Sequence, residues 1–231
     1  MQTIWNNLLN LFYPHLCLLC DKPLIEDEHE LCLHCLCNLP RSDYHKRPDN
    51  PMLKLFAGIP QLKEVAGFLL YEKEGYAQSL VHSFKYRNNK KLAKYLGRIA
   101  SSYLQADNLF NEIDILVPVP LHPKKERKRG YNQSELIAQG IASIYNKPVI
   151  PNVLYRKTAS STQTKKSRYE RHVNVEKIFA LHETETFRYK HILLIDDVIT
   201  TGATSIACIE ALTNVPDIRI SILALSTVEI K

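Results

Sequence analysis

Two adjacent carboxylates and a hydroxyl-rich loop carry the most informative chemistry of this chain. Residues 192–204 read Ile-Leu-Leu-Ile-Asp-Asp-Val-Ile-Thr-Thr-Gly-Ala-Thr. The four apolar residues predict a short buried strand that ends at Asp196 and Asp197, and residues 205–212 predict a helix. Ligands of parallel α/β sheets bind beyond the carboxyl ends of strands, and a helix N-terminus favours phosphate. Two acids there suit ribose hydroxyls, or a divalent metal that bridges to a polyphosphate, so the segment predicts a site for a phosphorylated ribose.

The alternative interpretation is an ordinary buried strand followed by a helix N-cap. It is less favoured, because a carboxylate pair with no basic neighbour in the sequence is costly to keep near a core without a ligand. Other phosphate-binding motifs are absent from the sequence, which contains neither G-x-x-x-x-G-K-[ST] nor G-x-G-x-x-G.

The segment resembles the phosphoribosyl pyrophosphate (PRPP) signature of type I phosphoribosyltransferases. The resemblance implies that the two acids hold the ribose 2′ and 3′ hydroxyls and that the threonine-rich loop holds the 5′-phosphate. It assigns PRPP binding to Asp196, Asp197, Val198, Ile199, Thr200, Thr201, Gly202, Ala203 and Thr204.

Paired cysteines near the N-terminus predict a structural zinc site. Cys17-x-x-Cys20 and Cys32-x-x-Cys35 are separated by eleven residues, which is typical of a zinc ribbon with four cysteine ligands. No Lys or Arg precedes Lys22, so the positive region of a secretory signal is missing and disulfides are disfavoured. The alternative is four reduced thiols. A core this small would then have neither a metal ion nor a disulfide to stabilise it. Three neighbours could replace one ligand: His15, His34 and Cys37.

The remaining composition is that of a modestly basic globular protein. The net charge of +6 is compatible with an anionic ligand or a nucleic acid but specifies neither. Trp5, Leu8, Leu9 and Phe12 have helical spacing and predict a short helix that packs on its own protein, with an interfacial membrane role as the alternative. No stretch approaches the roughly 18 apolar residues of a membrane span, and we expect a cytoplasmic protein.

Alternating strand and helix patterns predict an α/β fold with a mostly parallel sheet flanked by helices. We divide the chain into residues 1–50, which hold the N-terminal helix, the ribbon and a proline-containing linker, and residues 51–231, a phosphoribosyltransferase-like domain. Strands are expected at 65–71, 113–119, 148–154, 191–195 and 218–225, and helices at 75–84, 90–104, 133–145 and 204–212.

Two basic segments extend the predicted site. After the strand 113–119 comes a loop with Lys124, Lys125, Arg127, Lys128 and Arg129, which suits a group with several negative charges. In type I phosphoribosyltransferases this loop receives pyrophosphate, which implicates Pro120, Arg129 and Gly130. Residues 156–179 are where that fold inserts a mobile lid, which implicates Gln163 and Arg171. The alternatives are a solvated basic loop and a solvated hairpin.

Taken together, several motifs resemble the ComF family of competence proteins. They are the four-cysteine ribbon, Ser83-Phe84-Lys85-Tyr86, Val117-Pro118-Val119-Pro120, Arg129-Gly130-Tyr131-Asn132-Gln133, residues 163–179 and the Asp-Asp signature. The resemblance implies a PRPP- and Mg²⁺-binding protein that handles incoming single-stranded DNA during natural competence, with a helicase-like partner and a recombination mediator. It also implies phosphoribosyl transfer, although no general base or acceptor can be named. Two other hypotheses stay open: a single-stranded nucleic-acid-binding module, with Tyr131, Tyr155 and Tyr169 as stacking candidates, and a partner-docking protein.

Overall fold

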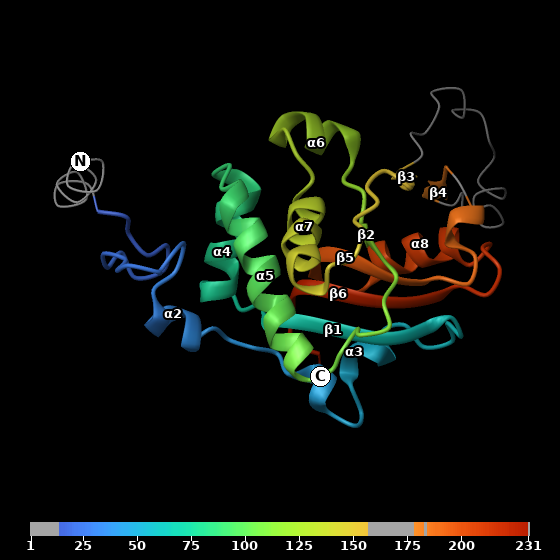
Figure 1. Ribbon diagram of the computed structural model, residues 1–231, viewed down its shortest axis with the longest axis horizontal. Coiled ribbons are helices and arrows are strands. Elements are labelled where there is room, and N and C mark those ends of the chain that lie inside the picture. Colours follow the sequence, from blue (N-terminus) through green and yellow to red (C-terminus); the bar gives the residue numbers. More distant parts are fainter. Residues whose placement is uncertain (1–13, 157–177, 183, 231) are drawn as a thin grey trace, which may run out of the picture.

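The computed structural model describes residues 14–156, 178–182 and 184–230. Within this part of the chain, a four-stranded parallel sheet forms the centre, in the order β1-β6-β5-β2 (Figure 1). Its strands are β1 (Leu62–Leu70), β6 (Arg219–Thr227), β5 (His191–Ile199) and β2 (Ile115–Pro118). Most residues of β5 and β6 are buried, as expected for parallel strands that are covered on both faces. The predicted α/β architecture is confirmed.

Helices cover both faces of the sheet. On one face lie α4 (Tyr76–Tyr86), α5 (Lys90–Ala106) and α7 (Gln133–Tyr145); on the other lie α3 (Pro51–Lys54) and α8 (Ala203–Leu212). The side chains of β5 alternate accordingly. Leu193 packs in the core with α4, α5 and α7, whereas Leu194 packs in the core with α3 and α8.

Close contact between α5 and α7 fixes the position of α7. A Cβ atom on Gly97 would lie 2.3 Å from the carbonyl oxygen of Ile137, and one on Gly140 would lie 2.1 Å from that of Lys94. Only glycine therefore lets the two backbones approach this closely. The first residue of α7, Gln133, reaches the site described below.

Most predicted elements are confirmed, with their ends shifted by a few residues. These are the strands expected at 65–71, 113–119 and 218–225 and the helices expected at 75–84, 90–104, 133–145 and 204–212. The basic segment after β2, however, is not a loop but the helix α6 (Pro123–Arg129). The His122 side chain caps it by accepting a hydrogen bond from the Lys124 N–H at 3.2 Å.

The strand predicted at 148–154 is wrong. Only Val149 forms an isolated bridge, to Leu116 of β2. Pro148 lacks the N–H that would extend the ladder towards residue 114, and Pro118 of β2 lacks the N–H that would donate to Ile150, so the ladder cannot extend in either direction. The chain instead forms β3 (Leu154–Arg156), which pairs antiparallel with β4 (Phe179–Leu181) in a separate sheet. A 3-10 helix, η3 (Glu185–Phe187), then leads towards β5.

The expected linker, which contains Ser42 and Tyr44, lies against the sheet. The Ser42 N–H donates to the carbonyl oxygen of Phe68 in β1 at 3.0 Å, and Tyr44, at the start of the 3-10 helix η1 (Tyr44–Lys46), is only 4% exposed. The division into residues 1–50 and 51–231 stays a prediction.

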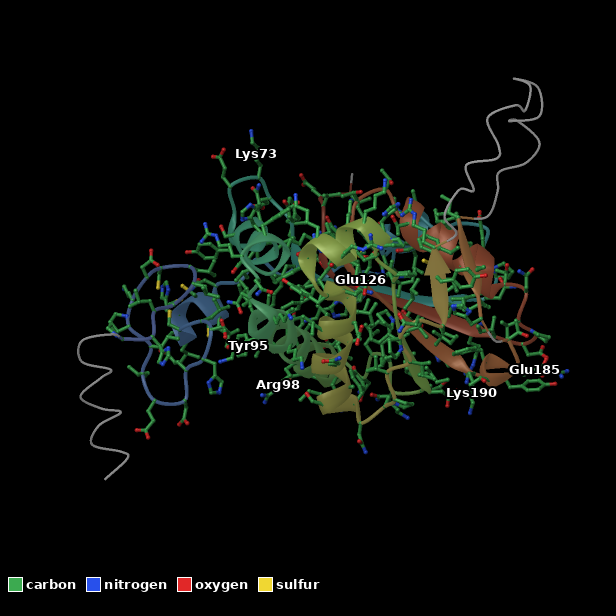
Figure 2. All side chains as sticks on the ribbon, turned by 90° about the horizontal axis from the view of Figure 1, so that it is seen from above. Lys73, Tyr95, Arg98, Glu126, Glu185 and Lys190 are labelled. Carbon is green, nitrogen blue, oxygen red and sulfur yellow. The ribbon has the colours of Figure 1, made fainter. Side chains whose placement is uncertain are left out.

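The cysteine-rich ribbon packs on α5. It contains the short helix α2 (Leu33–Cys37), and its Leu31 belongs to the same core as α4, α5 and α7. The His29 and Tyr95 rings meet edge to face at 6.3 Å, and Figure 2 shows Tyr95 on α5 beside the ribbon. The helix predicted at residues 3–12 lies outside the described residues. Among the helices that are described, none has the length and apolar character to cross a membrane.

Candidate functional site

The two acids of the signature lie within β5, not after its end. Pairing of β5 with β2 stops at Ile195, opposite Pro118, whereas its pairing with β6 continues to Ile199, opposite Thr227. Asp196 and Asp197 therefore occupy the part of β5 that β2 no longer covers. Both are largely buried, at 8% and 6% exposure.

A cleft of about 230 Å³ opens over these acids. The structure brings together six of the residues predicted from sequence, which are Asp196, Asp197, Val198, Thr204, Pro120 and Arg129. It adds others that sequence reasoning did not assign to the site, notably Lys85, Gln133 and Arg156. The cleft thus combines a carboxylate pair with cations from three separate elements.

Lys85 is the basic neighbour that the local sequence of the acids lacks. Its Nζ lies 2.9 Å from Oδ2 of Asp197, and the Lys85 side chain is only 20% exposed. The acid pair therefore has a basic neighbour in the folded protein, although it has none nearby in the sequence. Lys85 belongs to the Ser-Phe-Lys-Tyr motif noted above, and that motif was the only sequence signal for it.

A chain of side-chain hydrogen bonds also holds Asp197. The Gln133 side-chain amide donates to Oδ2 of Asp197, and Nη1 of Arg129 donates to Oε1 of Gln133. Arg129, at the end of α6, is thereby tied to the acids through the first residue of α7. The Arg-Gly-Tyr-Asn-Gln motif thus positions two polar side chains in one cleft.

The surroundings of Asp196 perturb its titration strongly. Its Oδ1 accepts the Asp197 N–H at 2.8 Å, and its Oδ2 accepts the Ser205 hydroxyl at 3.4 Å. Burial, followed by the neighbouring Asp197 carboxylate, raises the pKa of Asp196 to about 7. Lys85 offsets this only in part. The cleft thus keeps a carboxylate where its charged form is costly, as functional sites often do.

The threonine-rich loop connects β5 to α8. Gly202 is the N-cap of α8 with φ 75°, a conformation that disfavours other residues, and a Cβ atom there would lie 3.1 Å from the Phe56 ring. Thr200, Thr201, Ala203 and Thr204 are exposed, and the first N–H groups of α8 lack partners within the helix. Ile199 is 1% exposed in the core, so it supports the loop from behind.

The remaining predicted site residues lie elsewhere. Gly130 ends α6 with φ 80° and is not among the residues that line the cleft. Gln163 and Arg171 lie outside the described residues. Tyr131, a stacking candidate, is buried, and its hydroxyl donates to the carbonyl oxygen of Phe84, so the described structure leaves its ring no open face.

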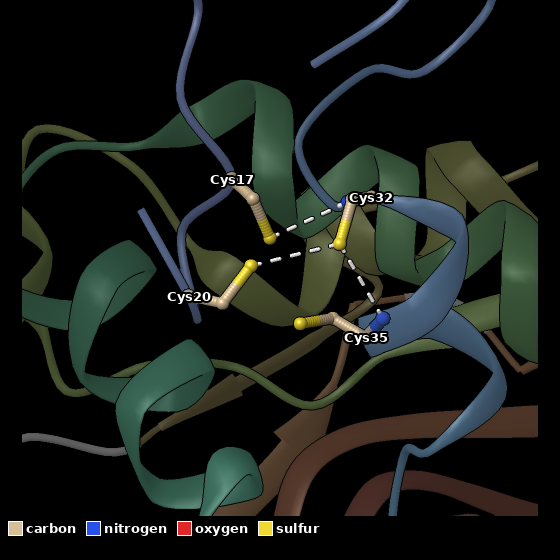
Figure 3. Close-up of side chains that lie close together, drawn as sticks. All are labelled: Cys17, Cys20, Cys32 and Cys35. Atoms are coloured by element: carbon tan, nitrogen blue, oxygen red, sulfur yellow. Dashed lines mark hydrogen bonds between the residues drawn. The ribbon is translucent and has the colours of Figure 1, made fainter. Parts of the chain in front are cut away.

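The four paired cysteines form a second candidate site. The sulfur atoms of Cys17, Cys20, Cys32 and Cys35 all lie within 4.8 Å of one another (Figure 3). Those of Cys20 and Cys32 are 3.6 Å apart, far longer than a disulfide bond. Sulfurs bound to one tetrahedral zinc ion would be about 3.8 Å apart. Backbone N–H groups of Cys32 and Cys35 point at Sγ of Cys17 and Cys32, at 3.3 and 3.5 Å. These four cysteines could hold a metal ion.

Three curated relatives place these sites in context. Competence protein F of Haemophilus influenzae is 30% identical over 129 residues, which cover 54% of this chain and 56% of that protein. The DNA utilization protein YhgH of Salmonella typhimurium is 26% identical over 84% of this chain and 88% of its own length. Competence protein ComFC of Bacillus subtilis is 26% identical over 82% of this chain and 68% of its own length. The chain is a homologue of the ComF competence proteins.

Other comparisons of this ComF homologue add little. No protein-family model matches it. The allosteric regulatory enzyme of purine biosynthesis has a TM-score of 0.38 and 20% identity, covering 56% of this chain and 25% of that one. A purine phosphoribosyltransferase from Pyrococcus horikoshii has a TM-score of 0.31 and 17% identity, covering 55% and 71%. These TM-scores are too low to support an argument. The fold of this ComF homologue is therefore described by its own parallel sheet and flanking helices.

Proposed function

We propose that this ComF homologue binds PRPP together with Mg²⁺ in the cleft over Asp196 and Asp197, and that it acts on incoming DNA in the cytoplasm. The observation that carries the proposal is the convergence on one cleft of a buried carboxylate pair, a helix N-terminus and cations. A phosphorylated ribose with a pyrophosphate group needs all three.

Each part of PRPP has a matching part of the cleft. The carboxylates of Asp196 and Asp197 accept hydrogen bonds from the ribose hydroxyls. The loop 200–204 surrounds the 5′-phosphate, which meets the N–H groups at the start of α8. Arg129 and the segment from Pro120 face the pyrophosphate. In this proposal, Gly130 shapes the turn behind Arg129, and Gln163 and Arg171 complete the site from the lid side.

Magnesium fits the donor chemistry of the cleft. Mg²⁺ prefers oxygen ligands and is bound in proteins by one or two carboxylates together with substrate phosphates. Asp196 and Asp197 supply such oxygens, and PRPP supplies the rest. When bound, Mg²⁺ neutralises charge on the pyrophosphate.

The site would support transfer of the phosphoribosyl group, and the protein's part in it is mainly positioning. Lys85 and Gln133 hold Asp197 in place, so its carboxylate is oriented before the ribose binds. We assign no general base.

The role in DNA uptake rests on the names of the relatives and on charge. Proteins named for competence and DNA utilization match this chain, one of them over most of both lengths. The exposed basic helix α6 suits a phosphate backbone. Single-stranded DNA, a helicase-like protein and a recombination mediator are the proposed partners. The second candidate function, non-catalytic binding of single-stranded nucleic acid, rests on α6 as well.

Calorimetric titration of PRPP with Mg²⁺ tests the proposal. We expect saturable binding to the wild-type protein and its loss when Asp196→Asn and Asp197→Asn are combined, with unchanged circular dichroism as the control for folding. Equal binding to both proteins would contradict the assignment of the acids. A folded wild-type protein that binds oligo-dT but not PRPP would favour the second function.

A further inference from the structure

A second cleft, of about 540 Å³, adjoins the cleft over the acids. The end of α4 and the turn after it form one wall, and α6 forms the other. The two clefts share Lys85, Tyr86, Lys125 and Arg129, whereas Asn88 and Lys128 line only the second. No acid lines the second cleft among the described residues.

Among the described residues, no acidic side chain of this cleft balances its positive charge. Lys85 pairs with Asp197, and Arg129 donates to Gln133. In the described part of the chain, Lys125 and Lys128 form no ion pair, whereas surface lysines such as Lys54 do. Lys125 and Arg129 are also four residues apart on one helix, a spacing at which like charges destabilise. An anionic ligand would offset this repulsion.

An open aromatic ring completes the cleft. Tyr86 lines the cleft together with these cations, and it is 70% exposed. The His82 ring supports it at a centroid distance of 4.7 Å, and the Arg129 guanidinium lies 5.9 Å from its centroid. A supported ring with such exposure offers a stacking face to a planar group, and stacking of that kind does not depend on the identity of the ring.

We propose that this second cleft binds a planar aromatic anion, a ring that stacks on Tyr86 and carries a phosphate or carboxylate group towards Lys125 and Lys128. The volume is that of an ordinary small-molecule site. The inference rests on the proposed function in one respect only: the ligand would lie beside PRPP and serve as the second ligand of the same site.

The probe is 1-naphthyl phosphate, whose binding is followed by its fluorescence. Tyr86→Leu should weaken binding at least about fivefold, whereas Tyr86→Phe, which keeps the ring, should not. Lys128→Gln should weaken it about fivefold, and Lys128→Arg should restore it. Lys73→Gln removes an equal charge from a residue outside the cleft and serves as the matched control. Inorganic phosphate, which lacks the ring, should compete only weakly.

The outcomes separate this inference from the function proposed above. Wild-type affinity in both Tyr86→Leu and Lys128→Gln, or equal affinity for inorganic phosphate, would overturn the inference. The inference would also be overturned if oligo-dT bound in a way that depends on Tyr86 while 1-naphthyl phosphate did not bind. The Tyr86 ring would then stack on the bases of single-stranded DNA and not on a small ligand. If the wild-type protein fails to bind PRPP while the naphthyl phosphate pattern holds, the proposed function fails and this site stands.

Discussion

Replacing Asp196 by asparagine should stabilise the protein above pH 7 while it abolishes PRPP binding. Burial and the Asp197 carboxylate raise the pKa of Asp196 from 3.8 to about 7 in the folded state. The folded protein therefore holds this proton more tightly than the unfolded chain does. The free energy of unfolding is highest while Asp196 is protonated and falls as the pH rises from about 4 to about 7. Asparagine keeps the hydrogen-bonding shape without the charge.

The size of the gain follows from the size of the pKa shift. At about 1.36 kcal/mol per pKa unit, we expect Asp196→Asn to raise the free energy of unfolding by a few kcal/mol at pH 8. At pH 5 the gain should be less than half as large, although the carboxyl of the unfolded chain is already ionised there. Urea unfolding at both pH values measures this. Asp49→Asn, at an exposed carboxylate, is the matched control and should change little. An equal effect of Asp196→Asn at both pH values would show that its carboxylate carries no folding cost.

Loss of one ribbon cysteine should remove a bound zinc ion and destabilise the N-terminal part of the protein. Cys32→Ser removes a sulfur from the four-cysteine cluster, whose Cys17 and Cys35 are fully buried against the core that contains α5. Zinc binding contributes folding free energy in sites of this kind. We therefore expect Cys32→Ser to lower the free energy of unfolding by several kcal/mol, on the order seen for structural zinc.

Cys37→Ser is the matched control for this prediction, because Cys37 is exposed and outside the cluster. Metal content by mass spectrometry should be one zinc per chain in the wild type and in Cys37→Ser, and near zero in Cys32→Ser. Thermal unfolding should follow the same order. Equal zinc content in all three proteins would contradict the site, and so would a wild-type protein that folds equally well after treatment with a chelator.

The parts of this protein that sequence could predict are those encoded locally. The helical periodicity of residues 133–145 and the cysteine spacing each depend on neighbours in the chain, and the structure has α7 and the cysteine cluster where they were expected. The carboxylate pair after an apolar run likewise located the cleft.

The parts that sequence missed depend on packing between distant segments. Lys85 meets Asp197 from across the fold because α4 and β5 converge at the same edge of the sheet. The continuation of β5 past Asp196 depends on β6, since the acids would end the strand if only their own polarity mattered. Tyr131 looks like an exposed loop residue, but α4 supplies a carbonyl partner that holds it inside. No local pattern contains these partners.

Structure determination of the protein with PRPP and Mg²⁺ bound would show directly whether Asp196 and Asp197 contact the ribose. We expect the ribose 2′ and 3′ hydroxyls within hydrogen-bonding distance of the Asp196 and Asp197 carboxylates, and the 5′-phosphate in the loop 200–204. PRPP bound elsewhere, for instance by its phosphates alone along α6 with both carboxylates uncontacted, would contradict it.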